Sequence, residues 1–152
     1  MVATELEGTE IPSGEFGVEG WKAYLWADAT RDEEAAFRYD EDAEAVGEPG
    51  QLVPHSMCQH IVFEATGGIE ATMSRLTDDW KSGAALGGLR VEFHAPIETG
   101  TTLTVDGAIT SVVEKEGSSG GLTIVTHEYA VSTPDGDAVY DLEADMVLLE
   151  DL

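Results

Sequence analysis

A change in hydrophobic period near the middle of the chain constrains the fold more than any other feature. Between Ser56 and Leu76 the apolar and small residues recur at helical spacing on one face. These positions are Met57, Ile61, Ala65, Gly68, Ile69, Thr72, Met73 and Leu76. From Leu89 onward the period is two, in four segments separated by Gly- and Pro-containing turns. The pattern predicts one long amphipathic helix followed by four antiparallel strands.

The apolar face of a sheet of this size must be covered, and the predicted long helix over residues 55–76 can cover it. The simplest arrangement is a sheet wrapped around one central helix. This α+β architecture is the hot-dog fold, and its open edge strands usually pair with a second copy. We expect residues 21–152 to form this single domain, and residues 1–20 to form an acidic arm or a short first strand.

Smaller features give three further expectations. The segment "WKAYLWADAT" predicts a short helix with Trp21, Tyr24, Leu25 and Ala29 on one face. Gly67 and Gly68 are expected inside the long helix, where each costs about 1 kcal/mol and allows close packing of a neighbouring backbone. The single cysteine, Cys58, excludes an internal disulfide and is expected to be a buried structural thiol.

The charge is far from balanced, with 31 acidic and 7 basic residues and a formal net charge of -24. Such a chain repels nucleic acid and anionic membranes, so neither is expected as a partner. The acidic residues are spread along the chain, and this lysine-poor composition resembles proteins of halophilic archaea. At molar salt the screening length falls to about 3 Å, which removes most of the self-repulsion. A cytoplasmic location is expected, because the sequence has no signal peptide and no long apolar segment.

Two longer segments carry a resemblance to a known family. They read "FRYDEDAEAVGEPGQLVPHSM" and "LRVEFHAPIETGTTLTVDGAITSV". Their order resembles the MaoC-like hydratase/dehydratase branch of the hot-dog proteins. In that family a Gly-x-Pro-Gly-x-Ile-Val-His-Gly-Met motif opens the central helix, and an Arg-Phe-x-x-Pro strand and turn follow later. The resemblance extends over about residues 21–149.

The resemblance implies addition of water to a trans-2-enoyl thioester, or its removal from a 3-hydroxyacyl thioester. The backbone N–H of Ser56 would then stabilise the negative charge that develops on the thioester carbonyl. In the family an Asp activates water and a His five residues later helps to move the proton. The strict register places these on Glu33 and Arg38, and a one-residue insertion makes Asp32 the acid. Arg38 cannot exchange protons near neutral pH.

Other residues complete the predicted site. Asp40 and His55 are further catalytic candidates, and Arg38, Gly50 and Met57 are candidates for substrate binding. No metal is expected, because His55 and His60 lie about 140° apart around a helix. His94 and His127 are expected to face solvent or a dimer seam. No cofactor is expected beyond the thioester substrate itself, carried by coenzyme A or an acyl carrier protein.

Two other functions remain open, and so does the question of whether the chain is an enzyme. The segment "RYDEDAEAVG" also resembles the entrance of hot-dog acyl-CoA thioesterases, with Asp40 or Asp42 activating water and Glu64 as an alternative base. The missing histidine instead favours a non-catalytic subunit that pairs with a catalytic hot-dog partner. We therefore expect either a homodimer or a hetero-oligomer with another hot-dog subunit.

Overall fold

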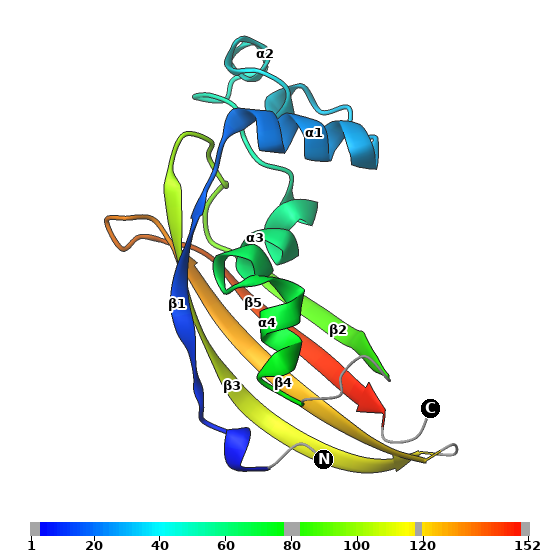
Figure 1. The fold of residues 1–152 in the computed structure, drawn as a ribbon. Helices are drawn as coiled ribbons and strands as arrows, with labels where there is room; N and C mark the ends of the chain where they lie inside the picture. The colour runs from blue at the N-terminus through cyan, green and yellow to red at the C-terminus, as the bar shows by residue number, and fades with distance from the viewer. Residues whose placement is uncertain (1–3, 78–82, 118–119, 150–152) are drawn as a thin grey trace.

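The computed structural model describes residues 4–77, 83–117 and 120–149, and these build one antiparallel sheet with helices on one face (Figure 1). The five strands lie in the order β1-β3-β4-β5-β2, so β1 and β2 are the edges. Their bounds are β1 Glu10–Gly17, β2 Ala84–Phe93, β3 Thr102–Gly117, β4 Gly120–Ser132 and β5 Ala138–Leu149.

In the described part of the chain, four α-helices and three short 3-10 turns accompany the sheet. Helices α3 and α4 lie in front of it, and α1 and α2 lie beyond one end (Figure 1). The helices are α1 Gly20–Thr30, α2 Asp40–Ala45, α3 Cys58–Ala65 and α4 Gly68–Ser74, and the turns are η1 Thr4–Leu6, η2 Ala35–Phe37 and η3 His55–Met57. No helix of the described residues is long and apolar enough to cross a bilayer.

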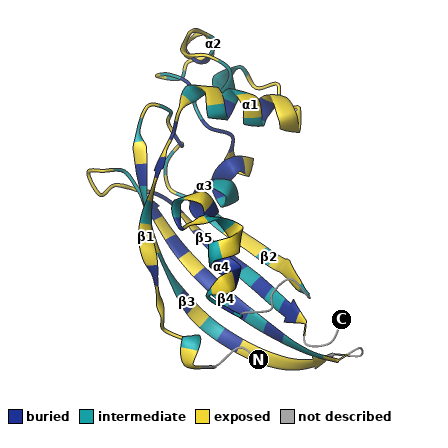
Figure 2. Cartoon of the chain, viewed as in Figure 1, coloured by how far each residue is buried: buried dark blue, intermediate teal, exposed yellow. Residues whose placement is uncertain are grey.

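The helix-facing side of the sheet forms the core. Buried and exposed residues alternate along β4 and β5, as Figure 2 shows in bands. The ring of Phe63 on α3 meets the ring of Tyr129 on β4 edge-on at 6.4 Å. The hydroxyl of Tyr140 on β5 donates a 2.9 Å hydrogen bond to the carbonyl of Cys58. The predicted hot-dog fold is therefore confirmed.

The central helix is not continuous, and the expectation that Gly67 and Gly68 lie inside it is wrong. Their φ angles are +103° and +82°, which do not occur in the interior of a right-handed helix. Helix α3 ends at Ala65, Gly67 precedes α4 as its N-cap, and Gly68 is the first residue of α4. The glycines therefore redirect the chain, so that two short helices cover the sheet.

The close backbone approach occurs at Gly14 on β1 instead. A Cβ atom added to Gly14 would lie 1.7 Å from the carbonyl oxygen of Ala65. The same strand pairs with β3, and its register shifts between Ile11 and Gly14. Glu10–Gly17 is thus an edge strand of the main sheet, held against the last turn of α3.

Helix α1 forms as predicted, but a different face is buried. Ala23 and Ala27 are buried, whereas Trp21 is 58% and Leu25 is 54% exposed. Small residues on the inner face let α1 lie close to the segments beneath it, and the large side chains stay outside. Cys58 is buried as expected, and burial raises the pKa of its thiol, which disfavours a reactive thiolate.

Candidate functional site

The entrance to α3 is built by the Gly- and Pro-rich segment before it. Gly47 takes a φ of +94° just after α2, a conformation that glycine adopts without strain. The buried side-chain amide of Gln51 then donates to the carbonyls of Gly20, Phe37 and Arg38 at 2.9 to 3.0 Å. Next, the Val53 amide bonds to the Ile97 carbonyl at 2.8 Å. These bonds fix the direction in which the chain enters η3 and α3.

A hollow of about 620 Å³ lies beside this entrance, and both Asp32 and Ser56 line it. It is lined by Thr30, Arg31, Asp32, Glu33, Glu34, Ala35 and Ser56. Arg31 ends α1 with a φ of +56°, and the Asp32 amide bonds back to the Ala27 carbonyl at 2.8 Å. The Asp32 carboxylate accepts a hydrogen bond from the Glu34 amide at 3.3 Å. Asp32, the predicted acid, and Ser56, whose backbone amide is the predicted donor, therefore line the same hollow.

Ser56 is held in place through its side chain. The indole N–H of Trp26 donates a 3.0 Å hydrogen bond to the Ser56 hydroxyl. Ser56 lies in the first turn of η3, where amides lack acceptors within the helix. A carbonyl oxygen that develops negative charge can accept a hydrogen bond at such a position. Because the hydroxyl is bound to Trp26, the side chain of Ser56 has a fixed orientation.

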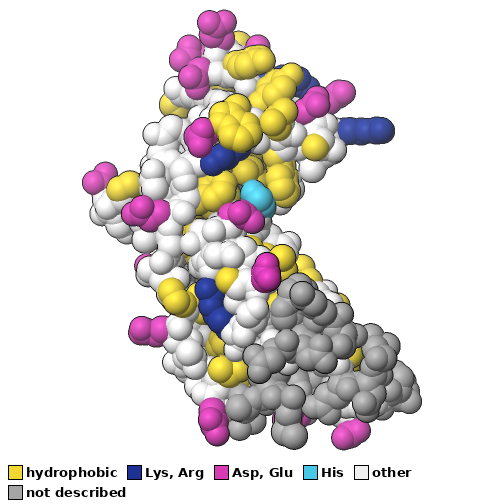
Figure 3. Space-filling model, viewed as in Figure 1, with side chains coloured by type: hydrophobic (Ala, Val, Ile, Leu, Met, Phe, Trp, Pro, Cys, Tyr) yellow, Lys and Arg dark blue, Asp and Glu magenta, His cyan; other side chains and the backbone are white. Residues whose placement is uncertain are grey.

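His60 and Trp26 line a second, more apolar hollow of about 370 Å³. Its ring stacks on Trp26 at 5.3 Å and meets Phe16 edge-on at 6.0 Å. The face in Figure 3 shows hydrophobic side chains gathered over the α1 end of the molecule. Sequence reasoning missed His60 as a neighbour of the site. The available signal was its position four residues after Ser56, one helical turn further on.

The remaining predicted residues lie around the entrance but outside the 620 Å³ hollow. Arg38 lies over the ring of Tyr24, with 5.8 Å between its guanidinium carbon and the ring centre. The Asp40 carboxylate accepts a 2.8 Å hydrogen bond from the backbone N–H of Gln51. Gly50 packs near the Asp40 carboxylate. Met57 is buried and lines the 370 Å³ hollow together with His60. The His55 ring stacks on the Phe93 ring, with 3.8 Å between their centres.

The expectation that His127 faces solvent or a dimer seam is wrong. His127 is 1% exposed. Its ring lies on the helix-facing side of β4, nearly parallel to the Tyr129 ring, with 6.2 Å between the ring centres. Burial lowers the pKa of His127, which favours the neutral imidazole. The period-two pattern fixed which residues share a face, but charge and polarity suggested the wrong face for this one.

His94 belongs to an exposed cluster on the outer face. Its Nε2 lies 2.8 Å from an oxygen of Asp141, and ligand atoms of Glu92, His94 and Asp141 all lie within 4.8 Å of one another. That geometry could hold a metal ion.

The hydrogen bond to Asp141 raises the pKa of His94. Because the pKa of His94 is higher in the folded state, protonation of its ring stabilises the fold. This stabilisation is fully present below the unfolded-state pKa of about 6.5 and is lost as the pH rises through the folded-state pKa. We predict that an NMR titration of the His94 ring gives a pKa above 6.5, and that Asp141→Asn lowers it. An unchanged His94 pKa in that variant would show that the ion pair does not form in solution.

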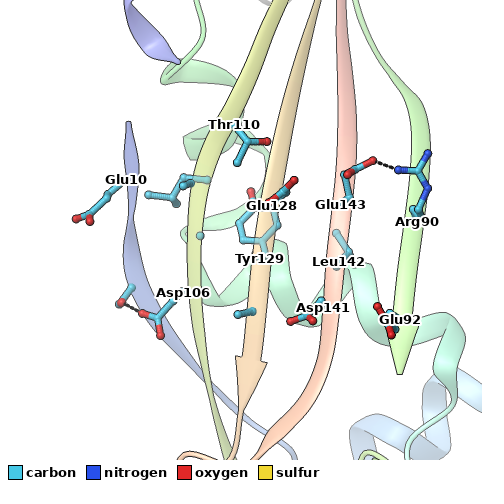
Figure 4. Close-up of a pocket in the computed structure, with 15 residues that line it drawn as sticks. Glu10, Arg90, Glu92, Asp106, Thr110, Glu128, Tyr129, Asp141, Leu142 and Glu143 are labelled. Carbon is cyan, nitrogen blue, oxygen red and sulfur yellow. Dashed lines mark hydrogen bonds and ion pairs between the residues drawn. The ribbon is translucent and has the colours of Figure 1, made fainter. Parts of the chain in front are cut away.

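A larger hollow of about 680 Å³ lies on the outer face of the sheet, away from the helices (Figure 4). Small residues on the central strands, Gly107, Ala108 and Ala130, leave the space open. Its acidic residues are Glu10, Glu92, Asp106, Glu128, Asp141 and Glu143, and its basic residue is Arg90, which pairs with Glu143. A surface of this charge does not suit an anionic thioester carrier.

The sequence matches FAS1-like dehydratase domain regions over residues 5–142. The chain belongs to this family. The family match confirms the predicted kinship with dehydratases, and the solved structures described next share the predicted hot-dog fold. No curated protein matches the sequence.

Several solved structures share the fold of this FAS1-like dehydratase family member. A chain of the (3R)-hydroxyacyl-ACP dehydratase complex HadBC from Mycobacterium tuberculosis is 21% identical, with a TM-score of 0.76 over 93% of this chain and 96% of that one. The MaoC-like dehydratase from Rhodospirillum rubrum is 16% identical, with a TM-score of 0.70 over 100% and 99%. The (R)-hydratase from A. caviae is 17% identical, with a TM-score of 0.65 over 97% and 100%.

Proposed function

We propose that the protein is a hydratase or dehydratase of acyl thioesters, with Asp32 as the proton-transferring group and the Ser56 amide as the donor to the thioester oxygen. The observation that carries this proposal is the hollow that Asp32 and Ser56 share at the entrance of α3. Membership of a dehydratase family supports the reaction class. The same fold hosts other reactions, so the residues in the hollow have to carry the rest of the argument.

The proposed reaction uses one carboxylate in two roles. Asp32 takes a proton from water, and the oxygen of that water forms a bond to C3 of the enoyl group. The electron pair of the double bond moves toward the thioester carbonyl, whose oxygen accepts the Ser56 N–H. Asp32 then returns the proton to C2, which restores the carboxylate. Dehydration of the 3-hydroxyacyl thioester follows the same steps in reverse.

This scheme accounts for the absent histidine. Arg38 occupies the family's histidine position in the strict register, and it lies over Tyr24 rather than in the hollow. A guanidinium does not exchange protons near neutral pH. In the proposed site Arg38 therefore binds the substrate or its carrier, and the carboxylate moves the proton by itself.

We further propose that the chain pairs with another hot-dog subunit, either a second copy or a different chain. Both edge strands of the sheet are open among the described residues, and Leu86 and Leu89 on β2 are 41% and 43% exposed. HadBC, which shares the fold, is described as a complex. If the site needs a partner's histidine, the protein alone would be a non-catalytic subunit, and the position of Arg38 favours this second function.

Hydration can be tested with purified protein and crotonyl-CoA at molar salt, where the 24 net negative charges are screened. We expect loss of the enoyl absorbance without release of free thiol. Thiol release would instead indicate the thioesterase. Silence in both assays, alone and with a dyad-bearing hot-dog partner, would contradict the proposed enzyme and leave a binding role.

A further inference from the structure

Three buried polar atoms without hydrogen-bond partners lie between α4 and the centre of the sheet. They are Nη1 of Arg75, Nδ1 of His127 and the hydroxyl oxygen of Tyr129. His127 and Tyr129 are 1% and 2% exposed. Buried polar groups in folded proteins nearly always have partners, because an unmade hydrogen bond loses the solvation of both groups. Three such atoms in one part of the core point to a missing ligand.

Two of the three side chains are adjacent, and the charge of the third acts on both of them. His127 and Tyr129 project from the same face of β4, with ring centres 6.2 Å apart and ring planes at 7°. Arg75 follows α4 and folds back across Gly67, where its Nη2 donates a 2.6 Å hydrogen bond to the Thr66 carbonyl. Burial raises the pKa of Tyr129 to about 12, and the nearby charge of Arg75 and the Thr66 side chain act against that rise. The Thr66 hydroxyl already donates to the carbonyls of Val62 and Phe63, so its proton is not available to Tyr129. The same charge contributes to the lowered pKa of His127.

The charge of Arg75 is the unusual feature. The chain has 31 acidic residues for 7 basic ones, yet Arg75 forms no ion pair with a carboxylate among the described residues. Asp145 is the carboxylate whose charge raises the pKa of His127. It already accepts a 2.7 Å hydrogen bond from the Thr126 hydroxyl. A guanidinium can only donate hydrogen bonds, and a phenol and one nitrogen of a neutral imidazole can also donate, so an acceptor with negative charge can satisfy all three atoms.

We propose that Arg75, His127 and Tyr129 bind a small carboxylate between α4 and β4, at a site separate from the hollow of Asp32 and Ser56. Arg75 is partly exposed, so the ligand can enter from the α4 side. The carboxylate could be a free small anion or the far end of an acyl chain that carries a second acid group. Either source uses the same three donors.

The test measures ligand-induced thermal stabilisation, which needs no turnover and so is independent of the proposed reaction. Sodium formate and sodium acetate are titrated against sodium chloride at constant molar ionic strength. In parallel, adipyl-CoA is compared with hexanoyl-CoA, which differs by the terminal carboxylate. A ligand that binds the folded state raises the melting temperature with its concentration. We expect one carboxylate source to do so and chloride not to.

Two buried tyrosines provide the matched variants. Tyr129→Phe removes an unpartnered hydroxyl, so the ligand-free protein should be as stable as the wild type or more stable, while carboxylate affinity falls about tenfold or more. Tyr140→Phe removes a hydroxyl that is bonded to Cys58, so it should lower stability and leave the carboxylate response intact. Arg75→Met should also abolish the response.

The pattern of responses decides the proposal. Stabilisation by formate or acetate identifies a free anion, and stabilisation by adipyl-CoA alone identifies the end of a dicarboxylic acyl chain. Two results would overturn the proposal. One is the same response to carboxylate and chloride in the wild type, and the other is a carboxylate response that survives both Arg75→Met and Tyr129→Phe. Either would leave a buried water as the partner of these atoms.

Discussion

Asp32→Asn is expected to lower the rate of crotonyl-CoA hydration by about 100-fold to 10,000-fold, the usual contribution of a general base. The amide keeps the oxygen that accepts the Glu34 N–H but cannot take a proton from water. The variant should therefore fold normally and bind substrate. The initial rate at molar salt, with circular dichroism of the same sample, measures the effect.

Two matched variants make that result specific. Asp28→Asn removes one charge from α1 outside the hollow, so its rate should stay within a few-fold of the wild type. Glu33→Gln tests the strict register of the resemblance, in which Glu33 is the acid. A normal rate in Asp32→Asn together with a large loss in Glu33→Gln would transfer the catalytic role to Glu33.

Gly14→Ala is expected to lower the free energy of unfolding by about 1–3 kcal/mol or more, because it overpacks the contact between β1 and α3. The added Cβ would lie 1.7 Å from the carbonyl oxygen of Ala65, and a backbone oxygen cannot rotate away. Helix α3 would have to move, and the entrance at its other end would move with it. Urea unfolding at constant molar salt gives the change in stability from the shift in midpoint.

Gly17→Ala is the control on the same strand. A Cβ at Gly17 meets no heavy atom within 4 Å, so the change should stay within about 0.5 kcal/mol of the wild type. Equal effects of the two substitutions would show that strand propensity, rather than the contact with Ala65, explains the loss at Gly14.

Local pattern predicted the sheet well because its period of two depends on neighbouring residues alone. Tyr140, Leu142 and Met146 are all buried on one face, as that pattern requires. The break at Gly67 was missed because a helical period continues across it, although two glycines in sequence carried the signal. Strand β1 has little periodicity, and its place at the sheet edge depends on pairing with β3, about 90 residues away.

The candidate site was predictable only in part, because it joins residues that are far apart in the sequence. Motif order suggested that the segment of Asp32 lies near the entrance at Ser56, and the structure places both in one hollow. The Trp26 bond to Ser56 joins residues 30 positions apart, which no local pattern reveals. The inward direction of His127 likewise depends on the helices that cover the sheet, so its polar side chain suggested the opposite face.

The proposed function depends on where the thioester oxygen lies when substrate is bound. A crystal structure of Asp32→Asn with crotonyl-CoA, grown at molar salt, measures this position directly because the variant should bind substrate without turning it over. We predict the thioester oxygen at about 2.9 Å from the Ser56 amide nitrogen, with C3 facing the side chain of residue 32. A thioester bound elsewhere, with the Ser56 amide covered by protein, would contradict the proposed function.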